Sequence, residues 1–173
     1  MNQLKILFMK TALKFSSFIL FAFLVTICNA QEDLINDEFP EAKQEVIETF
    51  GAIAQSIKDG DIDKLISYHA YGPKFTEFND GELRYTGEEN ESHEREFFGE
   101  TVDEGGVLNF AADDLQVAVY YGNVANLTFH SNFLLVIGGE EVKVRKQITL
   151  LFVKTKGEWK MVHEHHSDLK AGL

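Results

Sequence analysis

The feature that most constrains the fold is a change in the spacing of the apolar residues near position 108. From Pro40 to Ile57, apolar side chains recur every three or four residues, which is typical of an amphipathic helix. After position 108, apolar, β-branched and aromatic residues alternate with polar ones, which predicts strands. A chain with helices first and a long run of strands afterwards is expected to form an α+β domain, with the helices on one face of the sheet.

Three helices are predicted in the first part of this domain. The first has Pro40 near its first turn and ends before Gly60, a residue type that commonly follows a helix. Asp61 can cap a second, shorter helix with its side chain. A short strand is expected over 74–78, and a third helix around 93–98.

Four strands are predicted in the second part, separated by turns that contain glycine. The turns are Gly122-Asn123, Gly138-Gly139 and Lys156-Gly157, which are typical of β-hairpins. The runs 124–137 and 140–155 are far longer than a common strand of about 5–6 residues, so the sheet is expected to bend and to contain bulges. The predicted architecture is a cone-shaped α+β fold, with N-terminal helices packed on a long, curved antiparallel sheet.

Counting outward from two-residue hairpins assigns each side chain to one face of this sheet. The face that the helices are expected to cover collects Gln116, Tyr120, Leu127, Phe129, Ile148, Leu150, Phe152, Trp159, Met161, His163 and His165. The opposite face is semi-polar, and we expect it to contact solvent or a second copy of the chain in a homodimer. A bulge or a three-residue turn would shift this register by one residue and exchange the two faces beyond it.

The N-terminal segment, 1–30, predicts a secretory signal peptide. Lysines charge its start, an apolar run follows over 15–27, and small residues end at Ala30. This run is shorter than the roughly 20 residues that span a bilayer. We therefore expect cleavage after Ala30 and export to the periplasm or the cell exterior, with no membrane attachment afterwards. Lipidation of Cys28 is the alternative.

Residues 31–173 are expected to form a single domain. The chain carries 16 Lys and Arg against 28 Asp and Glu, a formal net charge of −12. This balance leaves no basic surface to neutralise phosphates, which argues against nucleic-acid binding. Cys28 is the only cysteine of the sequence, so cleavage leaves neither a disulfide nor a thiol nucleophile. Asn90 and Asn126 begin N-glycosylation patterns, which matter only in a eukaryotic secretory route.

The densest group of chemically active residues is the segment His163-Glu164-His165-His166. Alternation places His163 and His165 on the apolar face, where two imidazoles can act as general base and acid. His163 is the candidate base, and His165 or Tyr120 would stabilise a developing oxyanion. Two alternatives stay open: both histidines serve only core hydrogen bonds, or they supply two ligands to a metal ion that lacks an evident third.

The candidate ligand pocket lies on the same face of the sheet. Its expected lining is Tyr68, His69, Gln116, Phe129, Ile148, Leu150 and Trp159. We expect this pocket to bind a small, largely apolar molecule without a metal or another cofactor.

The stretch from Gly157 to Ser167 resembles the C-terminal strand of SnoaL-like proteins, which belong to the nuclear transport factor two superfamily and are related to ketosteroid isomerase. It also resembles the end of the association domain of calcium/calmodulin-dependent protein kinases. The matching positions are Trp159, Val162, His163, His165 and Ser167. The order of elements over residues 40–168 fits the same fold.

The resemblance implies a cone-shaped fold with an internal pocket, often dimeric through the outer sheet face. Relatives include isomerases, polyketide cyclases, dehydratases and assembly modules. Many members carry a basic residue at the position of Gln147, so an anion-binding role is weakened here. The predicted function is an exported domain that binds a small, largely apolar molecule, with cofactor-free acid/base chemistry as the candidate reaction. The alternative is a non-catalytic binding or oligomerisation module.

Overall fold

The computed structural model describes residues 34–169. The predicted signal peptide, with Cys28 and the cleavage position, lies outside these described residues. Within them, the helices are α2 (Pro40–Asp59), α3 (Ile62–Ser67) and α4 (Gly87–Asp103). The strands are β1 (Thr76–Asn79), β2 (Glu82–Arg84), β3 (Val107–Tyr120), β4 (Val124–Ile137), β5 (Glu140–Val144), β6 (Lys146–Thr155) and β7 (Glu158–Asp168). None of these helices is both long and apolar enough to cross a membrane.

The helices form where the sequence predicts them. α2 ends at Asp59 and is capped by Gly60, which has a φ of 66° and donates its backbone N–H to the carbonyl oxygen of Ile57 at 3.2 Å. The side chain of Asp61 caps α3 by accepting a backbone N–H of its first turn at 3.0 Å. α4 includes the predicted segment 93–98 and extends beyond it at both ends.

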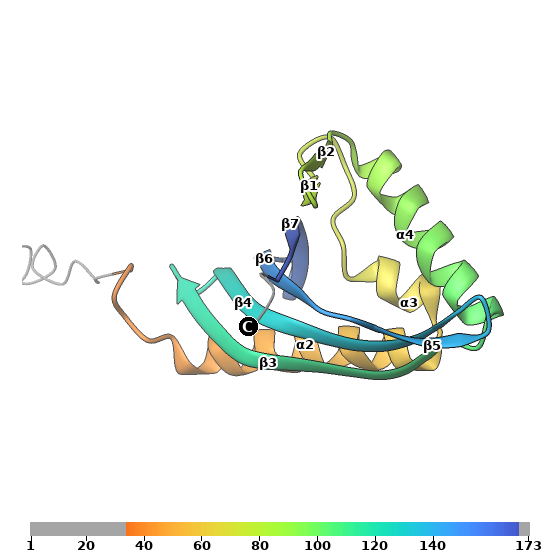
Figure 1. Ribbon diagram of the computed structural model, residues 1–173. Coiled ribbons are helices and arrows are strands. Elements are labelled where there is room, and N and C mark those ends of the chain that lie inside the picture. Colours follow the sequence, from red (N-terminus) through yellow and green to blue (C-terminus); the bar gives the residue numbers. More distant parts are fainter. Residues whose placement is uncertain (1–33, 170–173) are drawn as a thin grey trace, which may run out of the picture. The chain divides into compact units, whose positions relative to one another are not determined.

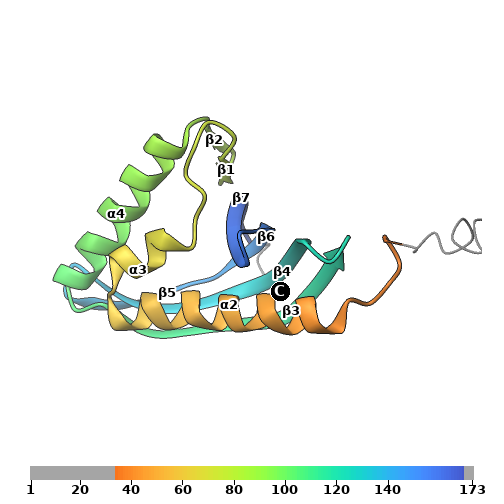
Figure 2. The ribbon, with the colours of Figure 1, turned by 180° about the vertical axis from the view of Figure 1, so that it is seen from behind.

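The strands form one mixed sheet with the order β2-β1-β7-β6-β4-β3, and β5 pairs with β4. β1 runs parallel to β7, whereas the other pairings of the described strands are antiparallel. α2 lies along β3 and β4, which curve along their length (Figures 1 and 2). The predicted α+β fold with helices on a long, curved sheet is confirmed, and the sheet is mixed rather than wholly antiparallel.

The predicted strand over 140–155 consists of two strands, because the pairing with β4 is interrupted at Arg145. β5 pairs with the end of β4, and β6 pairs with its beginning. At the break, the backbone N–H of Lys146 donates to the side-chain oxygen of Ser131 at 3.0 Å. The hairpin at Gly138-Gly139 and the predicted pairing of Leu127 with Leu150 are confirmed.

The predicted register between β3 and β4 is wrong by one residue. Tyr120 pairs with Val124, so the connection has three residues rather than two. Val119 therefore lies beside Ala125 on the inner face, while Tyr120 and Gln116 belong to the outer face. A bulge between Asp113 and Gln116 changes the register again further along β3.

The register between β6 and β7 also departs from the prediction beyond one bulge. Phe152 pairs with Met161 as predicted, but the next pair is Leu151 with His163. Val162 is the extra residue of the bulge. Beyond it, Glu164 and His166 lie opposite Leu150 and Ile148, on the face that the helices cover. His163 and His165 belong to the outer face instead.

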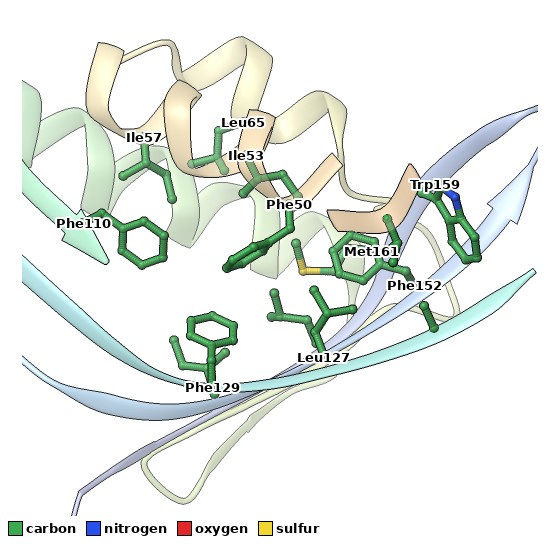
Figure 3. Close-up of a cluster of buried hydrophobic side chains, with 14 of the residues drawn as sticks. Phe50, Ile53, Ile57, Leu65, Phe110, Leu127, Phe129, Phe152, Trp159 and Met161 are labelled. Carbon is green, nitrogen blue, oxygen red and sulfur yellow. The ribbon is translucent and has the colours of Figure 1, made fainter. Parts of the chain in front are cut away.

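The core lies between α2 and the inner face of the sheet. In Figure 3, Phe50, Ile53 and Ile57 of α2 point toward Phe110 and Phe129 of the sheet. The rings of Phe50 and Phe129 have their centroids 5.0 Å apart. The same side chains form the apolar wall of a cavity between the helices and the sheet.

Candidate functional site

A cavity of about 510 Å³ lies between the helices and the inner face of the sheet. Volumes of this order are typical of small-molecule sites. Its apolar wall is formed by Phe50, Ile53, Ile57, Leu65, Phe97, Phe98, Phe110, Phe129, Phe133, Leu135, Ile137, Val144, Ile148, Leu150 and Met161. Its polar wall is formed by His69, Glu77, Asn79, Asp80, Glu82, Arg84, His93, Glu94, Ser131, Lys146, Glu164 and His166.

Glu164 is the centre of the polar wall. One of its carboxylate oxygens is 2.9 Å from His69 Nε2, and the other is 3.0 Å from His166 Nε2. The side chain of His69 is 1% exposed and that of Glu164 is 9% exposed, whereas that of His166 is 22% exposed. His166 is therefore the member of this trio that a bound molecule can best reach.

Hydrogen bonding fixes the proton positions on His69. Its Nδ1 lies 3.0 Å from the carbonyl oxygen of Leu65, which only accepts, so Nδ1 carries a proton. Its Nε2 faces the Glu164 carboxylate, which requires a second proton between them. Burial lowers the pKa of His69, but the Glu164 carboxylate outweighs this effect and raises it overall.

The pKa values of Glu164 and His166 are likewise shifted by their partners against the effect of burial. Burial raises the pKa of Glu164, but His69 and His166 outweigh burial and lower it well below its usual range. Burial lowers the pKa of His166, but its hydrogen bond to Glu164 outweighs burial and raises it overall. An ionised Glu164 between two cationic imidazoles is the arrangement that these shifts favour.

The chain positions His69 through a backbone bridge to β7. The N–H of Met161 donates to the carbonyl oxygen of Tyr68 at 2.9 Å, and the N–H of Ala70 donates to that of Met161 at 2.8 Å. The His69 ring also stacks on Tyr71, with centroids 4.7 Å apart. This bridge brings the end of α3 to the strand that carries Glu164.

The parallel pairing of β1 with β7 adds a second carboxylate to the wall. Glu77 lies beside Glu164 in the register and is 6% exposed. Arg84 on β2 donates to Glu77 at 2.7 Å, and the side chain of Asn79 donates to the same oxygen at 3.2 Å. Glu77 is therefore a buried carboxylate held by Arg84 and Asn79 through one of its oxygens.

Glu94 reaches the cavity from α4 and differs from the other buried carboxylates. Its carboxyl group is half-buried and makes no hydrogen bond or ion pair with any residue in the described range 34–169. Burial, followed by the negative charge of Glu164, raises the pKa of Glu94 to about 7. A carboxyl group with such a pKa can both give and take a proton near neutral pH.

The structure does not bring the predicted catalytic residues into the cavity. The outer-face His163 has its Nδ1 2.9 Å from the carbonyl oxygen of Thr76. His165 is exposed, with its ring centroid 6.0 Å from that of Phe78. Tyr120 lies on the outer face as well. The physical reasons are the bulge in β7 and the three-residue turn before β4.

The predicted pocket lining is brought together in part. His69, Phe129, Ile148 and Leu150 line the cavity, while Tyr68, Gln116 and Trp159 do not. Trp159 is buried beside α2, where its indole N–H donates to Glu45 at 3.1 Å. The centroid of the Tyr68 ring lies 5.1 Å from Lys64 Nζ.

Three site residues, Glu164, His166 and Glu94, were not predicted from the sequence. Glu164 and His166 belong to the histidine-rich segment 163–166, but to the face expected to contact solvent or a second copy of the chain. Glu94 occurs in an acidic segment and gave no local signal except its spacing of three and four residues from Phe97 and Phe98.

The outer face has a smaller polar hollow of about 300 Å³. It is lined by Asp114, Thr128, Phe129, His130, Gln147, Ile148, Thr149, His165 and Ser167. The bulge residue Asp114 has a φ of 57° and lies 3.1 Å from His130 Nδ1. This hollow is separated by the sheet from the cavity under the helices.

Comparison with known families decides what kind of domain this is. Residues 46–171 match the SnoaL-like domain. The chain belongs to this family. A search of curated proteins gave no match for this SnoaL-like chain.

Solved structures of related fold agree with this family. A protein from Streptomyces avermitilis, assigned as a dehydratase of the nuclear transport factor 2-like family, is 19% identical with a TM-score of 0.65; the match covers 76% of this chain and 99% of that one. A Xanthomonas campestris domain, assigned as a calcium/calmodulin-dependent protein kinase II association domain, is 18% identical with a TM-score of 0.62, covering 73% and 87%. A nuclear transport factor 2-like superfamily protein from Salmonella enterica serovar Typhimurium is 20% identical with a TM-score of 0.61, covering 78% and 96%. At these identities, the likeness shows the SnoaL-like fold.

Proposed function

We propose that this SnoaL-like domain binds a small, largely apolar molecule in the cavity and performs cofactor-free acid/base chemistry on it, of the isomerase or dehydratase type. The observation that carries the proposal is the pair formed by Glu94 and His166 on the polar wall. The pKa of Glu94 is raised to about 7, so this carboxyl group can exchange a proton near neutral pH, and the pKa of His166 is raised, which favours its proton-donating form. The likeness to a protein assigned as a dehydratase supports the same reaction class.

In this mechanism, Glu94 is the general base and His166 is the general acid. Glu94 takes a proton from a carbon next to a carbonyl group, and the electron pair of that C–H bond moves to the carbonyl oxygen. His166 donates its proton to this oxygen, so an enol forms. Return of a proton to a different carbon completes an isomerisation. When a hydroxyl group lies at the β-position, the enol oxygen returns its proton to His166 as the carbonyl group re-forms and the C–O bond to the hydroxyl breaks. His166 then passes this proton to the departing hydroxide, which leaves as water, and the proton held by Glu94 returns to His166 through solvent.

Glu164 and His69 act on His166 rather than on the substrate. The Glu164 carboxylate holds the His166 ring through Nε2 and stabilises its cationic form. His69 fixes the other oxygen of Glu164 at 2.9 Å. Both are therefore positioning residues, while the apolar wall around Phe50 and Phe129 takes the body of the substrate.

Exchange of carbon-bound protons into heavy water tests this chemistry without a known substrate. Benzylacetone offers an aromatic body and a ketone with exchangeable α-protons, which proton NMR can follow. We expect the chain to accelerate this exchange and Glu94→Gln to reduce the acceleration by about 10²–10⁴-fold, the range for one positioned acid or base. The control is Glu96→Gln, an exposed residue of the same helix. Bound benzylacetone without faster exchange would contradict the chemistry and leave a binding domain.

Export belongs to the same proposal and has its own test. The charged start, the apolar run over 15–27 and the small residues before Gln31 support cleavage after Ala30. The intact mass of the chain recovered from an exported fraction should equal that of residues 31–173. A chain that retains Met1 in that fraction would contradict cleavage, and a lipid adduct on Cys28 would favour the lipoprotein alternative.

A further inference from the structure

The charges on the cavity wall are unequal, and this inequality bears on what the cavity binds. Among residues 34–169, five carboxylate side chains line the cavity, together with two basic residues, Arg84 and Lys146. Both of these cations are already paired. Arg84 lies 2.7 Å from Glu77, and Lys146 contacts Asp80 and lies 3.4 Å from Asp168.

Two of the three histidines that line the cavity are already paired with a carboxylate. His69 and His166 bond to the two oxygens of the same carboxylate, Glu164. Glu94 is left as a half-buried carboxyl group without an ion-pair partner in the described part of the chain. A charge removed from water without a partner is unfavourable, so the wall is complementary to a group that supplies a positive charge or a hydrogen-bond donor.

We propose that the cavity takes an amphipathic molecule whose polar end is a protonated amine, bound at Glu94, and whose apolar end packs among Phe50, Phe110 and Phe129. This inference rests on the proposed function, because it uses the same cavity. An ammonium group would form a charge-assisted hydrogen bond with Glu94. A carboxylate in the same place would face Glu94, Glu164 and Glu77 together, and the two basic residues of the wall, Arg84 and Lys146, are already paired.

Amine binding is compatible with the role of Glu94 as a base. A carboxylate has two oxygens, so one can accept an N–H donor while the other accepts a proton from a nearby carbon. The ammonium charge also favours the ionised form of Glu94, which is the form that accepts a proton. The substrate class is then an apolar compound with a basic nitrogen close to the reacting carbon.

A matched series of three ligands tests the proposal. Phenylbutylamine, phenylbutanol and phenylbutyrate share one apolar body and differ in the charge of the end group. Isothermal titration calorimetry at slightly alkaline pH should show the amine binding about 10-fold more tightly than the alcohol, the effect of one charge-assisted hydrogen bond. The butyrate should bind most weakly.

Variants separate binding at Glu94 from attraction to an acidic surface. Glu94→Gln should reduce amine affinity to that of the alcohol and change alcohol affinity by less than about twofold, because only the charged contact is lost. Glu96→Gln removes the same charge from an exposed position of α4 and should leave the amine preference intact. An equal loss in both variants would overturn the placement at Glu94.

The outcomes distinguish this inference from the proposed function. Equal affinities for amine and alcohol, or tighter binding of the butyrate, would overturn the amine assignment while leaving the cavity as a binding site. Failure of all three ligands to bind would count against the proposed binding function itself. A preference for the amine that Glu94→Gln removes would support both.

Discussion

Glu164 matters more to the site than any other single side chain, because two of the three histidines that line the cavity, His69 and His166, bond to it. It is 7% exposed as a residue and has a partner for each oxygen. A buried carboxylate without its partners would be strongly unfavourable. His69, Glu164 and His166 therefore act as one unit in stability as well as in the proposed chemistry.

The free energy of unfolding should depend on pH through this unit. The pKa values of His69 and His166 are raised above 6.5, so their contribution is present below that pH and is lost as the pH rises through the raised values. The pKa of Glu164 is lowered below 4.5, so its contribution is present above that pH and is lost as the pH falls. The unit stabilises the fold most from pH 4.5 to 6.5.

Glu164→Gln should reveal this window. We expect a loss of about 1–3 kcal/mol in the free energy of unfolding near the middle of the window, and a smaller loss at alkaline pH, where neutral imidazoles gain less from the carboxylate. Urea unfolding at the two pH values measures both. Glu158→Gln, an exposed residue of the same strand, is the control. Equal losses of Glu164→Gln at both pH values would contradict the prediction.

Glu94 should act on stability in the opposite sense. Its pKa is raised from 4.5 to about 7, so ionising it costs stability as the pH rises through this interval, and the full cost applies above it. At slightly alkaline pH, Glu94→Gln should raise the free energy of unfolding by about 1–2 kcal/mol, a value reduced for the partial exposure of this side chain. Toward pH 4.5 and below, Glu94 is protonated in the folded chain, so the gain in the free energy of unfolding from Glu94→Gln should vanish. A destabilised variant at alkaline pH would refute the assignment of Glu94 as an unpaired group.

At the scale of elements, the position of α4 depends on a close contact at its first residue. A Cβ atom on Gly87 would lie 2.3 Å from the backbone nitrogen of Gly72 and 2.6 Å from the carbonyl carbon of Tyr71. Backbone atoms cannot move aside cheaply. This contact fixes the start of the helix that carries Glu94 beside the segment that carries His69.

Two glycine-to-alanine changes in α4 should therefore have opposite signs. Gly87→Ala should lower the free energy of unfolding by about 1–3 kcal/mol through overpacking and should weaken ligand binding by moving Glu94. Gly99→Ala has no atom within 4 Å of the added Cβ, so it should raise stability by about 0.5–1 kcal/mol through helix propensity. Thermal unfolding of both variants tests this. Destabilisation by Gly99→Ala as large as that by Gly87→Ala would show that the close contact is irrelevant.

The elements could be predicted from the sequence because they depend on local patterns. The spacing of apolar residues predicted the helices, and glycine-containing turns predicted the hairpins. The pairing of Leu127 with Leu150 followed from the turn at Gly138-Gly139. The bulge at Val162 could not be predicted in this way, because burial of Glu164 becomes favourable only when His69, far away in the sequence, provides its partner.

At the scale of the whole molecule, the outer sheet face is proposed to pair with a second copy of the chain. Phe78 on this face is 42% exposed, and the polar hollow lies on the same side. A twofold contact would cover the same surface on both copies. The cavity lies on the opposite side of the sheet, so association and ligand binding should be separable.

A charge placed on the outer face should test this pairing. Thr149 is half-buried and lines the hollow, so Thr149→Arg would bring two like charges together across a twofold axis. Sedimentation should show a dimer for the unaltered chain and a monomer for the variant, with phenylbutylamine affinity changed by less than about twofold. Lys156→Arg, an exposed residue of a turn, is the control. A monomeric unaltered chain would contradict the dimer.

The bulge in β7 has an evolutionary consequence. Regular pairing of Val162 with Leu151, without the bulge, would turn His163 and His165 toward the cavity and send Glu164 and His166 outward, because successive side chains of a strand alternate between its faces. The same residues therefore encode two different walls, and the bulge decides which of them faces the cavity. Deletion of Val162 would remove the bulge and keep Glu164 and His166 opposite Leu150 and Ile148, so a change in how position 162 is accommodated, rather than a shorter strand, would exchange the chemistry of the cavity.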